Sequence, residues 1–184
     1  MEITNPISTL AELERSDVFC FESFVRETTG RARFFARMLS AGDDALADDL
    51  VQRAYLAGLR NVNKHPCNQL SWSWLRTVLL NERRKRYRWA MVRERALPFL
   101  RTHTRTEVGK SEQDIPLKEK LKLALQALSQ KQREVFILVY FEQMTLKEAA
   151  ETLSIAEGTA KSHLHRALVQ LRTDLSEVWK AIQK

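Results

Sequence analysis

LKEAAETLSIAEGTAKSHLHRALVQL, residues 146–171, is the stretch of sequence that decides the fold. Leu146, Ala149, Ala150 and Leu153 follow an i, i+3, i+4, i+7 spacing, which predicts a short helix over 145–153. A break at 154–156 separates it from a second helix that begins near 157 and continues past 171. The small side chains at 149 and 150 let two helices cross closely at a steep angle. The stretch therefore predicts a helix-turn-helix.

The two predicted helices carry further local signals. Thr145 precedes the first helix and Glu148 follows three residues later, which is the pattern of a capping box. The second helix has an apolar stripe formed by Ala160, Leu164, Ala167, Leu168 and Leu171. Its opposite face carries Lys161, Ser162, His165 and Arg166. A recognition helix needs this division between scaffold contacts and donors to DNA. The alternative for this segment alone is an ordinary bundle with a solvated basic face.

Composition predicts an all-α protein that binds a polyanion. Only 5 Gly and 4 Pro occur among 184 residues, while 44% of the chain is hydrophobic. The net charge of +7 is unevenly distributed. Residues 1–60 carry 7 basic and 10 acidic side chains, residues 61–110 carry 12 and 3, and residues 111–184 carry 11 and 10. The middle of the chain is therefore the main candidate for contact with nucleic acid.

Several classes of site are not expected from this sequence. The chain has only two cysteines, Cys20 and Cys67, and no CxxC pair, so neither a disulfide framework nor a zinc site is predicted. His163 and His165 stand two residues apart on a helix and point about 200° away from each other, so they cannot chelate one metal ion. No signal peptide or membrane-spanning run is recognised. We expect a cytoplasmic protein with no membrane insertion, no cofactor and no metal.

The helical pattern predicts two small domains joined by a linker. In the first half, helices are expected over 17–40, from Asp43 or Asp44 to about 60, and from 71 to about 89 or beyond, with a polar loop at 61–70. Residues 1–16 suggest a frayed leader or a short helix, and 28–30 a bend. Periodicity fades over 98–116, and helices return at 117–128 and after a Ser129 cap. The predicted domains are therefore 1–97 and 117–184, with a flexible linker at 98–116 between them.

One helix carries an unusual concentration of cations. The run ERRKRYRW at 82–89 holds Arg83, Arg84, Lys85, Arg86 and Arg88, with two aromatic residues, Tyr87 and Trp89, among them. Such a run can be a solvated helix face. Five cations around one helix nevertheless repel each other unless anions are near, which favours nucleic acid.

The order of these segments resembles the extracytoplasmic-function (ECF) sigma factors, the subfamily of sigma-70 proteins that keeps only the sigma-two and sigma-four domains. ADDLVQRAYLAGL (47–59) looks like the sigma-two helix that docks on core RNA polymerase. WLRTVLLNERRKRYR (74–88) looks like the helix that opens and reads the minus-ten element. The stretch at 128–172 looks like the sigma-four domain that reads the minus-thirty-five element. The resemblance extends over about 21–172.

The resemblance assigns roles to individual residues. It implies that Asp48, Asp49 and Gln52 face the polymerase, and that the loop 61–70 takes a flipped minus-ten base. The residues implied in minus-ten binding are Asn61, Asn63, Lys64, Asn81, Arg83, Arg84, Lys85, Arg86 and Arg88. Those implied in minus-thirty-five binding are Thr159, Lys161, Ser162, His165 and Arg166. It also implies core RNA polymerase and promoter DNA as partners, an anti-sigma factor as a further one, and a monomer when free.

The chain departs from the family pattern at three places. Arg53 stands where the family usually has an acidic residue, so the polymerase contact differs there. Gln143 and Met144 replace the usual Gly-Leu before the helix-turn-helix. Ser71 occupies a position that is commonly aromatic, and the neighbouring Trp72 would supply the missing bulk.

The sequence predicts an alternative sigma factor and not an enzyme. No phosphate-binding glycine loop, nucleophile elbow or HExxH motif is recognised. The alternatives are an ordinary helix-turn-helix transcriptional regulator and a sigma mimic that does not initiate transcription. The first would need a ligand or receiver domain, for which the front half has no strands, and the intact basic helix argues against the second.

Overall fold

A computed structural model describes residues 6–61, 70–96 and 117–176, and side chains within 20–60, 70–92 and 119–176. These residues form seven α-helices and no strand, which confirms the predicted all-α fold class. The chain divides into two compact units, Met1–Lys85 and Arg86–Lys184, and the division falls within the third helix. The proposed bounds 1–97 and 117–184 remain predictions, and the linker 98–116 lies outside the described residues.

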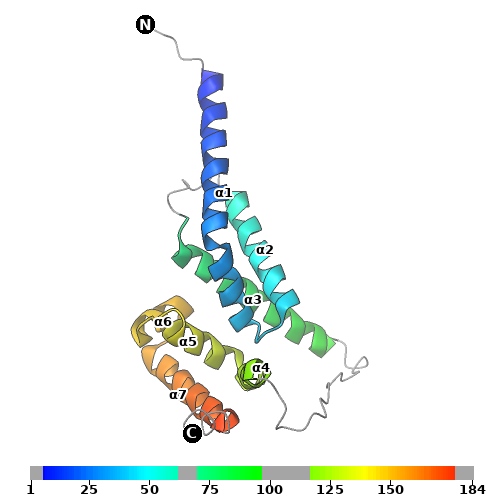
Figure 1. Ribbon diagram of the computed structural model, residues 1–184, viewed down its shortest axis with the longest axis vertical. Coiled ribbons are helices and arrows are strands. Elements are labelled where there is room, and N and C mark those ends of the chain that lie inside the picture. The colour runs from blue at the N-terminus through cyan, green and yellow to red at the C-terminus, as the bar shows by residue number, and fades with distance from the viewer. Residues whose placement is uncertain (1–5, 62–69, 97–116, 177–184) are drawn as a thin grey trace. The chain divides into compact units, whose positions relative to one another are not determined.

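The first unit is built on a hairpin of two helices, α1 (Pro6–Leu39) and α2 (Asp44–Asn61), which lie side by side in Figure 1. The turn between them uses two residues with left-handed backbone, Ala41 at φ 52° and Gly42 at φ 77°. Asp43 then caps α2, because its carboxylate accepts a hydrogen bond from the backbone N–H of Leu46 at 3.0 Å. The sequence left Asp43 and Asp44 as alternatives for this role.

Helix α1 is longer and more regular than the sequence predicted. It begins at Pro6, where a helix start was expected near 17, and it continues through 28–30 without interruption. The hydroxyls of Thr28 and Thr29 donate to the carbonyl oxygens of Phe24 and Val25, four residues earlier, at 2.6 and 2.5 Å. An interruption of the helix at 28–30 was therefore a wrong expectation, because α1 is continuous there and both threonines satisfy their hydroxyls on carbonyl oxygens of the same helix.

Aromatic side chains pack the third helix, α3 (Trp72–Ala96), against the hairpin. Trp74 lies edge-on to Phe24 of α1, with ring centroids 6.4 Å apart, and Trp72 lies edge-on to Phe35 at 5.8 Å. Arg31 also stacks its guanidinium over Trp72, 4.3 Å from the ring centroid. Leu50, Leu75 and Leu79 are fully buried in this core. Helix α3 starts after Ser71, whose hydroxyl accepts from the N–H of Trp74 at 3.3 Å.

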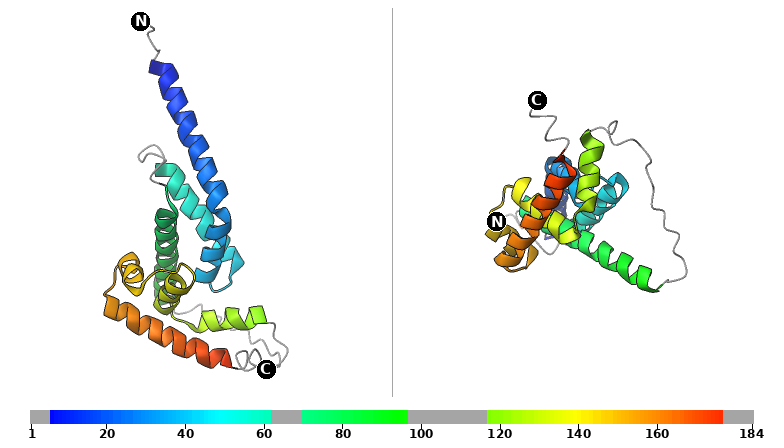
Figure 2. Two further views of the ribbon diagram at one scale, coloured as in Figure 1. Left: turned by 60° about the vertical axis from the view of Figure 1, so that its left-hand side comes forward. Right: turned by 90° about the horizontal axis from the view of Figure 1, so that it is seen from below.

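The second unit contains helices α4 (Leu117–Ala127), α5 (Gln130–Tyr140), α6 (Leu146–Leu153) and α7 (Glu157–Asp174). Helix α7 contacts the other three, as the views in Figure 2 illustrate. The predicted caps are confirmed, because both Ser129 and Thr145 form complete capping boxes, with Gln132 and Glu148 respectively. Buried Ala149 and Ala150 of α6 and Ala160 and Ala167 of α7 allow the close crossing that the sequence predicted.

Candidate nucleic-acid interface

The helix-turn-helix holds α7 by one apolar face. Helix α6 ends at Ser154, which adopts left-handed backbone at φ 54° and donates its N–H to the carbonyl oxygen of Ala150. Helix α7 begins three residues later, at Glu157. Ala160, Ala167 and Leu171 are buried, while Leu164 and Leu168 are half-buried. The apolar stripe predicted from the sequence therefore attaches α7 to the rest of this unit.

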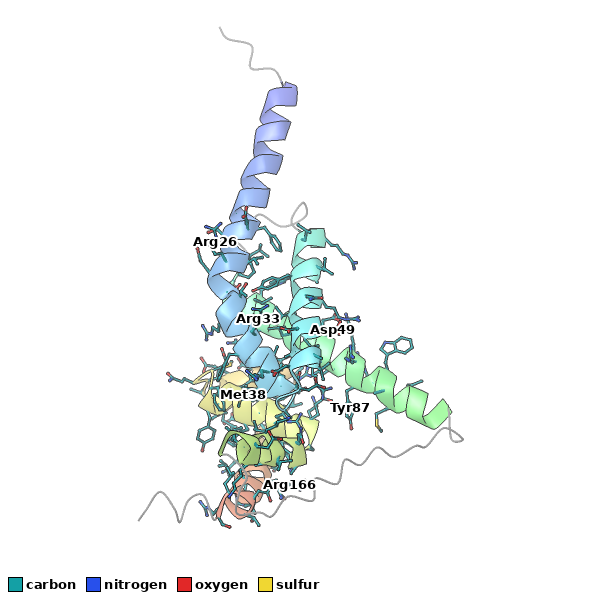
Figure 3. All side chains as sticks on the ribbon, turned by 45° about the vertical axis from the view of Figure 1, so that its right-hand side comes forward. Arg26, Arg33, Met38, Asp49, Tyr87 and Arg166 are labelled. Carbon is teal, nitrogen blue, oxygen red and sulfur yellow. The ribbon has the colours of Figure 1, made fainter. Side chains whose placement is uncertain are left out.

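The polar face of α7 is open to solvent. Lys161, Ser162, His165 and Arg166 are all exposed, and so is Thr159 in the first turn. The hydroxyl of Ser162 donates back to the carbonyl oxygen of Gly158 at 3.0 Å. Figure 3 labels Arg166 on this helix. Thr159, Lys161 and Ser162 lie in the first two turns of α7, near the N-terminus where backbone N–H groups and the helix dipole also favour phosphate, whereas His165 and Arg166 lie near the middle of the helix.

The basic cluster at 83–88 lies entirely on α3. Lys85, Arg86 and Arg88 are exposed, whereas Arg83 and Arg84 are half-buried. Lys85 forms an ion pair with Glu82 at 2.6 Å, and the Glu82 carboxylate reduces the net positive charge of the basic cluster. Asn81 is exposed, and it shares a helix face with Lys85 and Arg88 because they stand four and seven residues further on.

The acidic start of α2 presents a second kind of surface. Asp48 and Gln52 are exposed four residues apart, and Asp48 lies 3.6 Å from the guanidinium of Arg33 on α1. The single Nε–H of Arg53 donates a bifurcated hydrogen bond to both carboxylate oxygens of Asp49, at 2.9 and 3.0 Å. This hydrogen bond, and then the charge of Asp49, raise the pKa of the Arg53 guanidinium above its usual value. Figure 3 shows Arg33 and Asp49 on their neighbouring helices.

The predicted base-binding loop is described only at its edges. Asn61 is the last residue of α2, and nothing is described of its side chain. Asn63 and Lys64 lie outside the described residues. The role of 61–70 in holding a flipped base therefore remains a prediction from the resemblance.

The sequence reasoning missed two features, the exposed leucines of α2 and the disulfide at Cys20, and it named Trp89 in the basic run without establishing its exposure. Leu56 and Leu59 are exposed on the same face of α2 as Asp48 and Gln52, a spacing that the sequence itself contains. Trp89 is 74% exposed beyond the basic cluster, the largest exposure among the described large hydrophobic side chains. Cys20 is disulfide-bonded, which was not expected from two cysteines without a CxxC pair.

Within the described parts of the chain, no group of three or more His, Cys, Asp or Glu side chains could hold a metal ion. No helix among the described residues is long and apolar enough to cross a membrane.

An exposed polar face on the second helix of a helix-turn-helix, together with a separate basic helix, defines a helical DNA-binding protein. The model of the family "Sigma-70, region 4" matches residues 118–171, which include α5, α6 and most of α7. The chain is 32% identical to an RNA polymerase sigma-E factor of Streptomyces coelicolor, over 86% of this chain and 88% of that protein. It is 34% identical to the ECF RNA polymerase sigma factor EcfG of Rhodopseudomonas palustris, over 76% of each protein.

The solved structures that resemble this chain are also those of sigma factors. The sigma factor RpoE of Bartonella quintana, crystallised with the anti-sigma factor NepR, superposes with a TM-score of 0.61 at 26% identity, over 85% of this chain and 96% of that one. CnrH in complex with the cytosolic domain of CnrY has a TM-score of 0.57 at 21% identity, over 85% and 88% of the two chains, which shows the shared fold. The chain belongs to the ECF family of RNA polymerase sigma factors. It acts as an alternative sigma factor in transcription initiation, as the sequence predicted.

Proposed function

We propose that two helices divide the work of promoter recognition, with α7 reading the minus-thirty-five element and α3 acting at the minus-ten element. The observation that carries this proposal is the polar face of α7. Its scaffold side is buried through Ala160, Ala167 and Leu171, so Lys161, Ser162, His165 and Arg166 are left to contact DNA. Thr159 in the first turn would donate to a phosphate, which fixes register without reading sequence.

The minus-ten surface is the exposed face of α3 that Asn81, Lys85 and Arg88 share. On this proposal Arg88 and Lys85 bind phosphates, while Asn81 lies beside the flipped base. Arg83, Arg84 and Arg86 flank this face and add to its positive potential. Asn61, Asn63 and Lys64 would complete the site from the preceding segment.

Core RNA polymerase would dock on α2. Asp48, Gln52, Leu56 and Leu59 are exposed along one stripe of this helix, and they combine charge at one end with apolar contact at the other. A stripe of this composition suits a protein partner better than DNA, because carboxylates repel phosphates. Asp49 lies next to the stripe and is neutralised in part by Arg53.

The test is in vitro transcription with purified bacterial core polymerase on a library of promoters. Wild type is expected to start transcripts at sites that share two spaced elements. Lys161→Ala/Arg166→Ala should lose preference at the upstream element only, and Lys147→Ala, an exposed change on α6, is the matched control. If core polymerase gains no promoter activity from wild type, the chain would instead be a sequestering mimic or a regulator that binds DNA without polymerase.

The chain would also bind an anti-sigma factor, since the Bartonella relative is crystallised with one. Such a partner would cover the exposed surfaces of α2 and α7 that polymerase and DNA require. Protection of the 98–116 segment from protease by the partner would support this, and an unchanged cleavage pattern would count against it. We further propose that the protein is a non-enzymatic initiation subunit, a monomer when free, and that it works in the cytoplasm, where its polymerase and DNA partners are.

A further inference from the structure

The second half of α3 is exposed on all sides, a feature that the proposed function does not explain. In the first half of this helix, Leu75, Leu79 and Leu80 are buried. From residue 85 to residue 90, by contrast, every side chain is exposed. Six successive residues point in every direction around a helix of about 3.6 residues per turn. This stretch therefore buries little surface within the described chain.

Large apolar side chains stand in this exposed stretch and just after it. Trp89 is 74% exposed, Val92 58% and Tyr87 44%. Trp89 and Val92 are three residues apart, so they are neighbours on the helix surface, while Tyr87, which Figure 3 labels, lies on another side of α3. Single exposed apolar residues are common, whereas contiguous ones mark surfaces that bind a partner.

Cations surround Trp89 and decide which partner fits it. Lys85 and Arg86 stand four and three residues earlier, which is one turn of the helix, and Arg88 directly precedes it. All three cations are exposed. An apolar groove on a protein would have to strip water from these charges, which is costly. Nucleic acid avoids this cost, because it combines phosphates with the flat apolar faces of its bases.

The need for an accessible base face limits the partner to an unpaired strand. In a duplex, both faces of each base are covered by neighbouring base pairs, so a side chain reaches them only by unstacking the pairs. In a single strand the faces are available. Aromatic side chains within a positively charged surface are the usual means of binding single strands. On the proposed function, a single strand arises at the minus-ten element, where α3 acts.

Trp89 is too far along α3 to share the base that Asn81 would contact. The two residues are eight positions apart, which is about 12 Å along the axis at about 1.5 Å per residue. Stacked DNA rises about 3.4 Å per nucleotide, so about four nucleotides or fewer span this distance. The indole would therefore contact a second base, within about four nucleotides of the first.

We propose that Trp89 stacks on this second, unpaired base of the strand released at the minus-ten element, and so stabilises the open promoter without reading its sequence. The inference rests on the proposed function, in which α3 acts at that element. Arg86 and Arg88 bind phosphates beside the stacked base, and the indole covers the face of the base. Because every base has an aromatic face, the contact tolerates any base at this position.

The test uses the complex of core polymerase with the full-length protein and a fork-shaped DNA probe. The probe is duplex through the upstream element and single-stranded at the minus-ten element, and an abasic site is moved through the single strand. Trp89→Ala should weaken binding of the intact probe by about five- to a hundredfold, the range for loss of one base stack. At one abasic position the substitution should cause no further loss, because base and indole form a single contact.

Three further variants separate stacking from other roles of the side chain. Trp89→Phe keeps an aromatic face and should restore most of the affinity, whereas Trp89→Leu keeps only apolar bulk and should not. Tyr87→Ala, which removes an aromatic side chain from another side of the same half of α3, should keep the wild-type response to every abasic site. Equal further losses for Trp89→Ala at all abasic positions, or rescue by Trp89→Leu, would overturn the proposal.

Binding measurements without a single strand decide between DNA stacking and a protein contact. Trp89→Ala should equal wild type in binding a duplex that carries only the upstream element, and in competition for core polymerase without DNA. A loss in either measurement would assign Trp89 to duplex DNA or to the polymerase and overturn the proposal. If the wild-type complex does not prefer the fork probe to a duplex of the same sequence, the proposed function of α3 is refuted, and the stacking with it.

Discussion

The backbone of Gly58 lies so close to Trp74 that a methyl group added at Gly58 would sit 3.1 Å from Cη2 of the indole ring. The same methyl group would lie 2.9 Å from Cε2 of Phe21. Glycine at this point of α2 therefore allows α1 and α3 to pack on one side of the helix. Glycine is otherwise unfavourable in a helix by about 1 kcal/mol relative to alanine, so close packing is the physical reason for its presence.

Gly58→Ala is expected to destabilise the first unit in spite of the better helix propensity of alanine. Overpacking costs about 1–3 kcal/mol, and the propensity gain offsets only about 1 kcal/mol of it. Urea unfolding followed by circular dichroism measures the change. Gly30→Ala is the matched control, because a methyl group there meets nothing within 4 Å, and it should stabilise α1 by about 0.5–1 kcal/mol. Equal effects of the two substitutions would contradict the packing argument.

Gln143→Gly is expected to stabilise the second unit. Gln143 adopts left-handed backbone at φ 53°, which costs a residue with a Cβ about 1–2 kcal/mol. The greater freedom of glycine in the unfolded chain offsets part of this, so a gain of about 0.5–1 kcal/mol remains. Thermal unfolding measures it, and Gln143→Ala, which keeps the Cβ, should show no gain. A loss of stability in the glycine variant would mean that the Gln143 side chain contributes more than its backbone strain costs.

The sequence predicted the elements whose signals are local and left out those that depend on tertiary structure. Thr145 and Glu148 stand three residues apart, so their capping box could be recognised without a structure. The family usually has Gly-Leu where this chain has Gln143 and Met144, and a glycine at that position is typical of a left-handed turn. Only the structure shows that glutamine adopts this backbone conformation here. No periodicity predicts that a charged side chain such as Arg133 is buried. The role of Arg133 becomes clear only from the backbone carbonyl oxygens that its guanidinium contacts in the structure.

Arg133→Met should strongly destabilise the second unit. The Arg133 guanidinium donates to the carbonyl oxygens of Leu125 and Leu128, at 2.8 and 2.9 Å, and so satisfies acceptors at the end of α4. Removing a charged donor from buried acceptors costs about 2–4 kcal/mol in all. Urea unfolding of the full chain reports the change. Arg172→Met, on the exposed last turn of α7, should stay within about 0.5 kcal/mol of wild type. The capping role would be refuted by similar stabilities of the two variants.

Arg53→Ala is expected to raise the affinity for core polymerase severalfold. Nε of Arg53 holds the Asp49 carboxylate at 2.9 and 3.0 Å, so the substitution releases an acidic group beside the proposed docking stripe. Competition with a labelled sigma factor for core polymerase measures the effect. Arg60→Ala also removes one exposed cation from α2, but it lies two turns further along the helix and should change the affinity less. Equal gains would show that net charge, and not Asp49, governs the contact.

Arg88→Ala should lower the salt dependence of promoter binding by the polymerase–sigma complex. Arg88 is exposed on the α3 face that it shares with Asn81 and Lys85. Each phosphate contact releases condensed counterions, so losing one contact reduces the slope of log K against log salt by about 0.9 on duplex DNA or about 0.7 on a single strand. Binding is measured over several salt concentrations.

Arg26→Ala is the control for Arg88→Ala, because Arg26 is an exposed cation on α1 that lies 3.5 Å from Glu22 and outside the basic cluster. Its slope should equal that of wild type. Lys85→Ala should reduce the slope less than Arg88→Ala, since Glu82 already holds Lys85 at 2.6 Å and competes with phosphate for it. If all three variants keep the wild-type slope, the positive charge of α3 does not contact the DNA backbone, and minus-ten recognition must be sought away from this face of α3.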